Sequence, residues 1–280
     1  MKQFRILTLC CAVSVLALHG ALAQNAPAAT ATSPAAGTYE PKSGQDGKDV
    51  VWVPTPESLV DRMLDMAAIT KDDYLVDLGS GDGRTVIIAA KRGTRAHGIE
   101  YNPDMVALSQ RNAKAEGVAD RATFERADIF ESDFSKASVV TLFLLSNLNV
   151  KLRPTLLDMK PGTRVVSNSF DMGDWEPDER AEVSHECRNY CRALKWVIPA
   201  KVEGTWRLGE GELKLTQKYQ MLEGMLTVGG KSLPISAAKM DGTKIAFTVD
   251  NRRYTGEVAG GAMTGQVEGG PSWSATRAPG

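Results

Sequence analysis

The chain has 280 residues, of which 42% are hydrophobic and 24% are charged, and its formal net charge is -1. This length is sufficient for a sizeable core and for two domains. A nearly neutral chain gives no electrostatic reason to expect nucleic acid or an anionic membrane as a partner.

The first 23 residues have the pattern of an export signal. Lys2 and Arg5 precede an apolar stretch over residues 6–18, and small residues follow it at Ala21 and Ala23. We expect a signal peptidase to cleave after Ala23, which predicts a periplasmic or secreted protein. The apolar stretch is short for a membrane span, so no stable span is expected after cleavage. The alternative is an uncleaved N-terminal anchor.

Residues 24–48 are rich in Ala, Pro, Thr and Gly and predict a disordered linker. Once the signal is removed, Cys187 and Cys191 are the remaining cysteines. Two cysteines in an oxidising compartment usually pair, so we expect a local disulfide. His185 is the only nearby ligand of the type that zinc prefers, and a metal site is therefore not expected.

Residues 49–199 alternate helical patterns with short apolar runs. The first helix is expected to start at Pro56 with Thr55 as its N-cap, and Asn102 is expected to cap a helix that starts at Pro103. Further helices are expected near residues 85–93 and 149–159, and strands near residues 73–79, 96–100, 122–130, 137–145 and 162–170. This alternation predicts an α/β fold with a Rossmann-like, mostly parallel sheet covered by helices on both faces.

Residues 200–280 have a different pattern, with frequent glycine and about seven short alternating runs. This predicts a small antiparallel β domain, either a barrel or a sandwich. Trp206 and Trp273 lie in its first and last expected strands, where they are interpreted as core residues that close the sheet. Ligand stacking is the alternative role for these two rings.

The stretch VDLGSGDGR connects an expected strand to an expected helix, where backbone N–H groups commonly meet a ligand. Asp77, Gly79, Gly81 and Gly83 give the pattern D-x-G-x-G-x-G, with Ser80 inside the turn. A dinucleotide fingerprint would need glycine at position 84, which is arginine here. Asp77 would repel a pyrophosphate but attract an ammonium or sulfonium group. S-adenosylmethionine carries both cations and no phosphate, and is the expected cofactor.

Acidic residues follow the next two strands as well. Glu100 is placed to accept hydrogen bonds from ribose hydroxyls. Asp128 could accept a hydrogen bond from the adenine amino group, with Ile129 lining the ring. One such acid alone is more often a helix cap or a surface charge. Three acids at successive strand ends, together with the glycine turn, predict a cofactor site.

These motifs resemble those of class I S-adenosylmethionine-dependent methyltransferases. The segment VWVPTP, followed by DLGSGDGR, is more narrowly similar to bacterial relatives of the ATP-synthase c-subunit lysine methyltransferase family. The resemblance covers about residues 50–180 and implies a methyltransferase that uses S-adenosylmethionine. It also implies a protein acceptor, with lysine as one candidate, whereas a small molecule or another envelope component remains an alternative.

The residues that act on the acceptor are less clear from the sequence. Ser146 and Asn147 follow the fourth strand, where many methyltransferases contact the acceptor, although Asn147 also suits a helix cap. Asp171 and Trp175 lie beyond the fifth strand and could flank an acceptor channel, with a core position as the alternative for Trp175. An aromatic face would suit a methylated ammonium.

Two functions remain open at this point. The intact acids at Asp77, Glu100 and Asp128 favour an active methyltransferase. The export signal favours an exported binding protein that keeps the nucleoside pocket without turnover, with the β domain as its functional part.

Overall fold

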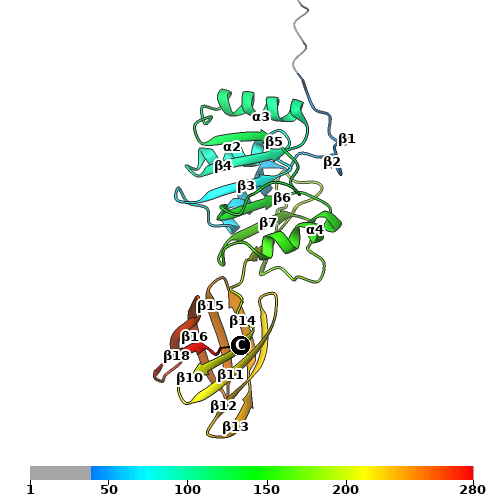
Figure 1. Ribbon diagram of the computed structural model, residues 1–280. Helices are drawn as coiled ribbons and strands as arrows, with labels where there is room; N and C mark the ends of the chain where they lie inside the picture. Colours follow the sequence, from blue (N-terminus) through cyan, green and yellow to red (C-terminus); the bar gives the residue numbers. More distant parts are fainter. Residues whose placement is uncertain (1–38, 280) are drawn as a thin grey trace, which may run out of the picture. The chain divides into compact units, whose positions relative to one another are not determined.

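The computed structural model describes residues 39–279, which contain four helices and eighteen strands. Figure 1 shows an α/β domain followed by a β-barrel domain. The expected signal peptide and residues 24–38 of the expected linker lie outside the described residues.

The α/β domain is built on a seven-stranded sheet with the order β5-β4-β3-β6-β7-β9-β8. The first five strands in this order are parallel, and β9 is antiparallel to both of its neighbours. This confirms the Rossmann-like fold, whose strands are β3 (Tyr74–Leu78), β4 (Arg95–Glu100), β5 (Ala122–Arg126), β6 (Val139–Leu142), β7 (Arg164–Asn168), β8 (Glu179–Glu182) and β9 (Arg192–Val197).

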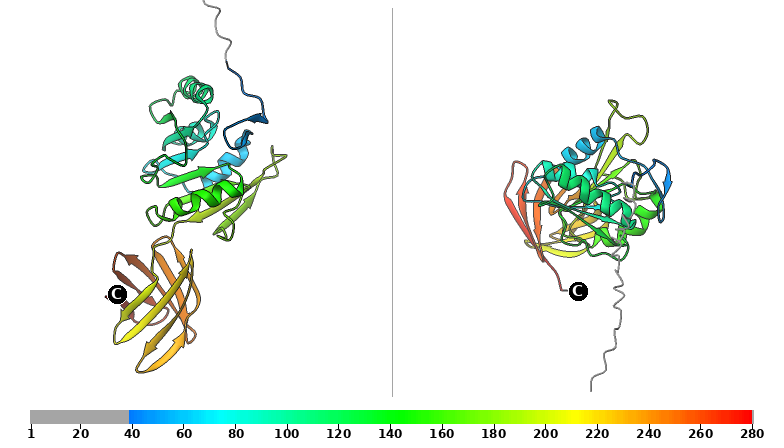
Figure 2. Two further views of the ribbon diagram at one scale, coloured as in Figure 1. Left: turned by 45° about the vertical axis from the view of Figure 1, so that its right-hand side comes forward. Right: turned by 90° about the horizontal axis from the view of Figure 1, so that it is seen from above.

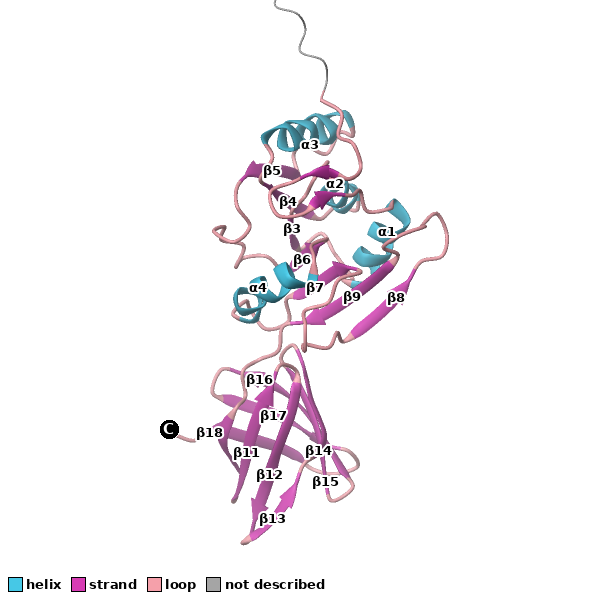
Figure 3. Cartoon of the chain, turned by 90° about the vertical axis from the view of Figure 1, so that its right-hand side faces the viewer, coloured by secondary structure: helices cyan, strands magenta, loops and turns pink. Residues whose placement is uncertain are grey.

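The helices cover both faces of this sheet. Helices α1 (Glu57–Met66), α2 (Arg84–Lys91) and α3 (Pro103–Ala115) contribute to one buried apolar cluster, and α4 (Ser146–Leu157) contributes to another. Figure 3 shows α1 and α4 on opposite sides of the sheet. Burial on both faces explains why all four residues of β6 are buried, instead of alternating between buried and exposed.

Two of the expected helix starts can be compared with the structure. Asn102 caps α3, because its side chain accepts a hydrogen bond from the backbone N–H of Asp104 at 2.9 Å. The prediction that Thr55 is the N-cap of α1 is wrong. The N-cap is Pro56, whose side chain forms no capping hydrogen bond. The Thr55 hydroxyl is buried and accepts a hydrogen bond from Asn168 instead, at 3.2 Å. Thr55 therefore ties α1 to the end of β7.

Strands β8 and β9 form a hairpin that the sequence pattern did not predict. The connection between them contains a disulfide between Cys187 and Cys191, which confirms the expected pairing. The hairpin packs beside β7, so this disulfide loop extends from the carboxyl-terminal edge of the parallel strands.

The C-terminal domain is a closed antiparallel barrel (Figure 2). Eight strands form the ring, which closes where β11 pairs with β12, and short strand β13 adds to the edge of β12. The expectation of about seven strands was low because it missed β13 and β14, which have no clear alternating pattern of burial. The strands are β10 (Gly204–Leu208), β11 (Gly211–Lys218), β12 (Met221–Val228), β13 (Lys231–Pro234), β14 (Ser236–Asp241), β15 (Lys244–Val249), β16 (Arg252–Ala259), β17 (Ala262–Val267) and β18 (Ser272–Arg277).

Trp206 and Trp273 belong to the core of this barrel, as expected. Trp206 has no exposed surface and Trp273 is 7% exposed. The strands that carry them, β10 and β18, pair with each other and thereby help to close the ring.

Part of the expected linker is structured, which corrects the prediction for residues 39–48. β1 (Gln45–Asp46) and β2 (Val51–Trp52) form a short antiparallel hairpin, which we call the N-terminal hairpin. The segment is polar, but Trp52 at its end packs on the glycine turn, where a Cβ at Gly81 would lie 2.4 Å from the indole Nε1. The composition of residues 39–48 does not reveal that the ring of Trp52 anchors the segment to the fold.

Candidate active site

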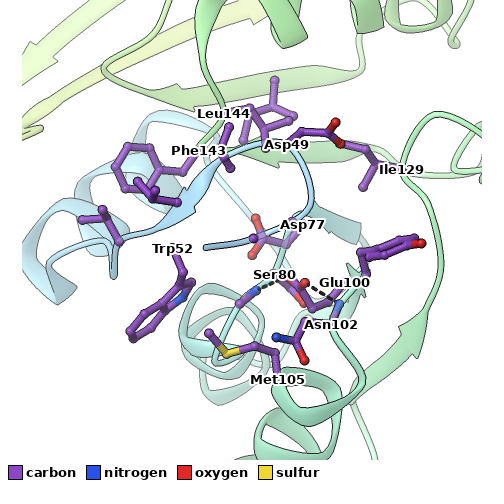
Figure 4. Close-up of a pocket in the computed structure, with 18 of the residues that line it drawn as sticks. Asp49, Trp52, Asp77, Ser80, Glu100, Asn102, Met105, Ile129, Phe143 and Leu144 are labelled. Carbon is purple, nitrogen blue, oxygen red and sulfur yellow. Dashed lines mark hydrogen bonds between the residues drawn. The ribbon is translucent and has the colours of Figure 1, made fainter. Parts of the chain in front are cut away.

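A pocket lies at the carboxyl-terminal edge of the parallel strands, where the expected cofactor motifs meet (Figure 4). Its lining comes from the glycine turn, from the segments after β4, β5 and β6, and from the N-terminal hairpin. The residues expected to bind the cofactor that line it are Asp77, Gly79, Ser80, Gly81, Glu100, Asp128 and Ile129.

The glycine turn leads from β3 into α2 through three residues with positive φ. Gly79, Gly81 and Gly83 have φ values of 83°, 54° and 82°. Gly83 does not belong to the pocket lining. A Cβ at Gly83 would lie 2.8 Å from Ser109 Cβ and from two atoms of the Phe124 ring. Its glycine therefore allows α2 to start close to α3 and β5.

Glu100, at the end of β4, holds two backbone segments of the pocket together. Its Oε2 accepts a hydrogen bond from Gly81 N–H at 3.0 Å, and its Oε1 accepts one from Asn102 N–H at 2.8 Å. These contacts fix the orientation of the carboxylate inside the pocket (Figure 4). Each oxygen keeps further acceptor capacity toward a ligand hydroxyl.

Asp77 is the most deeply buried acid of the site, with 7% of its surface exposed. The pKa of its carboxyl is raised to about 7: burial is the largest cause, a hydrogen bond from Thr141 opposes it, and the nearby Glu100 and Asp82 contribute in the same direction as burial. The Thr141 hydroxyl donates to Oδ1 at 2.6 Å. A cation placed beside this carboxyl would favour its ionised form.

Asp128 forms an ion pair with Lys48 of the N-terminal hairpin. The hydrogen bond from Lys48 lowers the pKa of the Asp128 carboxyl, and a hydrogen bond from Phe130 N–H at 3.0 Å acts in the same direction. The Lys48 ammonium also lies 5.0 Å from the centre of the Tyr101 ring, the residue after Glu100. Lys48 therefore occupies the edge of the pocket at which Asp128 was expected to meet an adenine amino group.

The expected acceptor contacts do not lie in this pocket. Ser146 and Asn147 are absent from its lining, because α4 already begins at Ser146 and Asn147 is exposed in its first turn. The alternative of Asn147 as a helix cap is also wrong, since Leu145 is the N-cap. Asp171 is exposed and accepts a hydrogen bond from Gly173 N–H at 3.2 Å, so it stabilises a turn.

Trp175 is a core residue, which corrects its expected place beside the acceptor. It has no exposed surface, and its Nε1 donates a hydrogen bond to Gln220 at 2.8 Å. Its ring lies 6.1 Å from the ring of Trp196 on β9. The side chain therefore stabilises the fold.

The pocket also contains residues that the sequence did not point to. Lys48 and Trp52 come from the N-terminal hairpin, and Phe143, Phe170 and Tyr190 line the pocket from three other segments. Phe143 follows β6 directly and Phe170 lies two residues after the end of β7, so the rule that identified the strand-end acids would also have found them. Tyr190 could be placed only once the disulfide loop was known.

The donor set fits S-adenosylmethionine. Glu100 presents a fixed carboxylate between two strand ends, where a ribose diol can donate to it. Asp77 supplies a buried carboxyl for a cationic group, and Ile129 supplies an apolar wall. The hydroxyl of Ser80 is buried and has no hydrogen-bond partner among the described residues. A polar group of a bound ligand would supply the missing hydrogen bond.

Residues 39–279 contain no cluster of three or more His, Cys, Asp or Glu side chains arranged to hold a metal ion. Over the same range, none of the helices is long and apolar enough to cross a membrane.

Comparison with known proteins identifies methyltransferases as relatives of this chain. The ANTKMT methyltransferase domain matches residues 77–179. A protein-lysine N-methyltransferase from Saccharolobus islandicus is 44% identical over 144 residues, which cover 50% of this chain and 89% of that protein. The human lysine N-methyltransferase of the ATP-synthase c-subunit is 35% identical over 128 residues, which cover 45% of this chain and 54% of that protein.

A solved structure gives a similar result for the fold. An RNA methyltransferase from Salinibacter ruber, crystallised with S-adenosyl-L-homocysteine, is 48% identical, with a TM-score of 0.51. The match covers 54% of this chain and 96% of that chain. The similarity thus extends over nearly the whole of two relatives and about half of the human one.

Proposed function

This chain belongs to the family of S-adenosylmethionine-dependent methyltransferases that contains protein-lysine N-methyltransferases, and we propose that it methylates lysine side chains of a protein in the cell envelope. The observation that carries the lysine acceptor is the 44% identity to a protein-lysine N-methyltransferase over 89% of that enzyme's length. The family excludes neither a small-molecule acceptor nor another envelope component.

Three carboxyl groups and the glycine turn would hold the cofactor. Glu100 would accept hydrogen bonds from the ribose, Asp128 would accept one from the adenine amino group, and Asp77 would face the cationic part, since all three line the pocket. The backbone of the turn from Gly79 to Gly81 allows close approach at the start of α2. When bound, S-adenosylmethionine supplies an electrophilic methyl group on a sulfonium.

The protein's own contribution to the reaction is to position and desolvate the acceptor. Leu142, Leu144 and Leu148 form an apolar wall of the pocket beside Asp77. A lysine side chain that enters along this wall loses its hydration, which lowers its pKa and favours the neutral, nucleophilic amine.

The envelope location rests on two observations. Residues 1–23 have the composition of an export signal, and the Cys187–Cys191 disulfide is typical of proteins in an oxidising compartment. A fusion of the full chain to alkaline phosphatase, which is active only after export, tests this proposal. We expect activity that disappears when residues 2–23 are deleted; equal activity with and without them would contradict export.

An RNA acceptor is the second candidate, because the Salinibacter ruber relative is described as an RNA methyltransferase. The net charge of -1 argues against it, since RNA binding relies on basic surfaces.

The two acceptors can be separated in a single labelling experiment. The full chain would be incubated with S-adenosylmethionine carrying a tritiated methyl group, together with an envelope protein fraction and total RNA. We expect label that is recovered as methyl-lysine after acid hydrolysis of the protein. Nuclease-sensitive label, with none in the protein fraction, would contradict the proposal.

A further inference from the structure

Three aromatic side chains gather at one side of the cofactor pocket. The ring centre of Phe143 lies 6.1 Å from that of Phe170 and 5.4 Å from that of Tyr190. Phe170 and Tyr190 lie 5.7 Å apart. All three line the same pocket as Asp77 and Glu100, and we call them the aromatic triad.

The triad is assembled from three separate segments. Phe143 follows β6 and Phe170 follows β7, whereas Tyr190 belongs to the loop closed by the Cys187–Cys191 disulfide. Local backbone geometry helps to present two of the rings. Ser169, just before Phe170, has a φ of 61°, and Tyr190 itself has a φ of 57°. Such left-handed conformations are costly for residues with a side chain and occur frequently at functional sites.

The faces of the triad are not used by the protein's own cations. Within residues 39–279, lysine or arginine groups lie over other rings near the pocket, such as Lys48 over Tyr101 and Lys151 over Phe130. No such contact involves Phe143, Phe170 or Tyr190 in that part of the chain. Tyr190 also remains 44% exposed, so its ring is accessible from outside.

We propose that the aromatic triad is the binding site for the ε-nitrogen of the acceptor lysine. This assignment rests on the proposed lysine acceptor and specifies where it binds. The triad and Asp77 line one pocket, so an amine held at the rings lies in the same cavity as the cofactor motifs. With this assignment, Phe143, Phe170 and Tyr190 take the place beside the acceptor that the sequence analysis gave to Trp175.

The aromatic rings can interact favourably with the lysine nitrogen before, during and after methyl transfer. Their apolar surface removes water from the neutral amine before the reaction. As the nitrogen acquires positive charge, the negative faces of the rings attract it, so they bind the charged state more tightly than the neutral one. A methylated ammonium, with its charge spread over methyl groups, fits an aromatic cage for the same reason.

The test measures binding of a small probe to the full chain in the presence of S-adenosylhomocysteine. The probe is Nα-acetyl-Nε-trimethyl-lysine amide, and its neutral counterpart has a tert-butyl group in place of the trimethylammonium. We expect the cationic probe to bind about fivefold or more tightly than the neutral one. Equal affinities would overturn the assignment, because an apolar groove would bind both alike.

Matched variants locate the probe. Tyr190→Leu should weaken the cationic probe at least fivefold and leave the affinity for S-adenosylhomocysteine unchanged, whereas Tyr190→Phe should retain probe binding because it keeps the ring. Tyr101→Leu, which removes an exposed ring of the pocket lining outside the triad, should leave the affinity for the cationic probe unchanged. Phe170→Leu provides a second variant of the triad.

The possible outcomes separate this assignment from the proposed function. If Tyr190→Leu and Phe170→Leu both bind the cationic probe as the parent chain does, the assignment is wrong, although the methyltransferase proposal stands as long as S-adenosylhomocysteine binds. If the parent chain fails to bind S-adenosylhomocysteine, the proposed function fails and the assignment fails with it.

Discussion

Lys48 of the N-terminal hairpin pairs with Asp128, a residue 80 positions later in the chain. The pair connects a segment outside the α/β core to the expected adenine end of the pocket. The proposed contact of Asp128 with adenine therefore puts cofactor and hairpin in competition for one carboxylate. This competition predicts that the hairpin responds to the cofactor.

The first prediction concerns Lys48→Met. Since both members of the pair are partly exposed, its loss should have a modest effect, and we expect the affinity for S-adenosylhomocysteine to rise up to about fivefold. In the parent chain this affinity should also rise as salt screens the pair, whereas Lys48→Met should show a flatter salt dependence.

Calorimetric titration at low and high salt measures both effects, with Lys42→Met, an exposed lysine of the same segment, as the control. A tenfold weaker affinity in Lys48→Met would show that Lys48 assists the cofactor instead of competing with it.

The second prediction concerns the pH dependence that Asp77 confers. Its carboxyl has a pKa of about 7 in the folded protein and an ordinary value of 3.8, so between these values the folded chain binds one proton more than the unfolded chain. The free energy of unfolding must then decrease as the pH rises from about 4 to about 7, and level off above it.

Asp77→Asn removes this dependence while retaining an oxygen for the Thr141 hydroxyl. We expect the variant to be more stable than the parent at pH 8, by roughly 2–4 kcal/mol, with a much smaller difference at pH 4. Urea unfolding at the two pH values measures this, and Asp72→Asn, an exposed residue just before β3, is the control. A stability difference independent of pH would contradict the burial of an uncharged Asp77.

The third prediction compares two alanine substitutions in the glycine turn. At Gly81 the new Cβ meets the Trp52 side chain, which can move with the N-terminal hairpin, so the domain should remain folded. At Gly83 the Cβ meets Phe124 and Ser109 within the core, and we expect a loss of about 2–4 kcal/mol from strain and overpacking.

Fluorescence distinguishes the two variants. Gly81→Ala should shift tryptophan emission to the red as Trp52 becomes exposed, and this shift should be absent in a Trp52→Phe background. If Gly81→Ala proved as destabilising as Gly83→Ala, the hairpin would be an inseparable part of the fold.

The fourth prediction concerns the disulfide between Cys187 and Cys191. Closing so small a loop contributes about 2 kcal/mol by the chain-entropy relation. The double variant Cys187→Ser, Cys191→Ser should lose about this much stability in urea and bind S-adenosylhomocysteine normally, since none of the residues proposed to hold the cofactor belongs to this loop. Its affinity for the trimethyl-lysine probe should decrease, because Tyr190 is no longer held. Unchanged probe affinity would show that the disulfide does not position Tyr190.

The sequence predicted the α/β fold and the acids of the cofactor site for one physical reason. Carboxyl ends of parallel strands meet at one edge of a sheet, so Asp77, Glu100 and Asp128 could be placed together without any structure. The same argument did not hold for Ser146 and Asn147, which are absent from the pocket lining; α4 begins at Ser146, three residues earlier than expected.

The parts that could not be predicted depend on contacts between distant segments. The N-terminal hairpin is held by Trp52 on Gly81 and by Lys48 on Asp128, and neither contact has a periodic signature in the chain. Tyr190 reaches the pocket because β8 and β9 add to the sheet as an antiparallel hairpin, a pairing that local patterns leave open.

Calorimetric titration of the full chain with S-adenosylhomocysteine tests the central claim most directly. Glu100→Ala removes a charged acceptor of two ribose hydrogen bonds, each worth about 1.5–3 kcal/mol, so the affinity should fall at least ~100-fold. Glu116→Ala, an exposed glutamate that pairs with Lys91, should bind as the parent chain does. Micromolar binding that is lost only in Glu100→Ala is the predicted result. No binding by a cooperatively folded parent chain at millimolar ligand, or undiminished affinity in Glu100→Ala, would contradict the account.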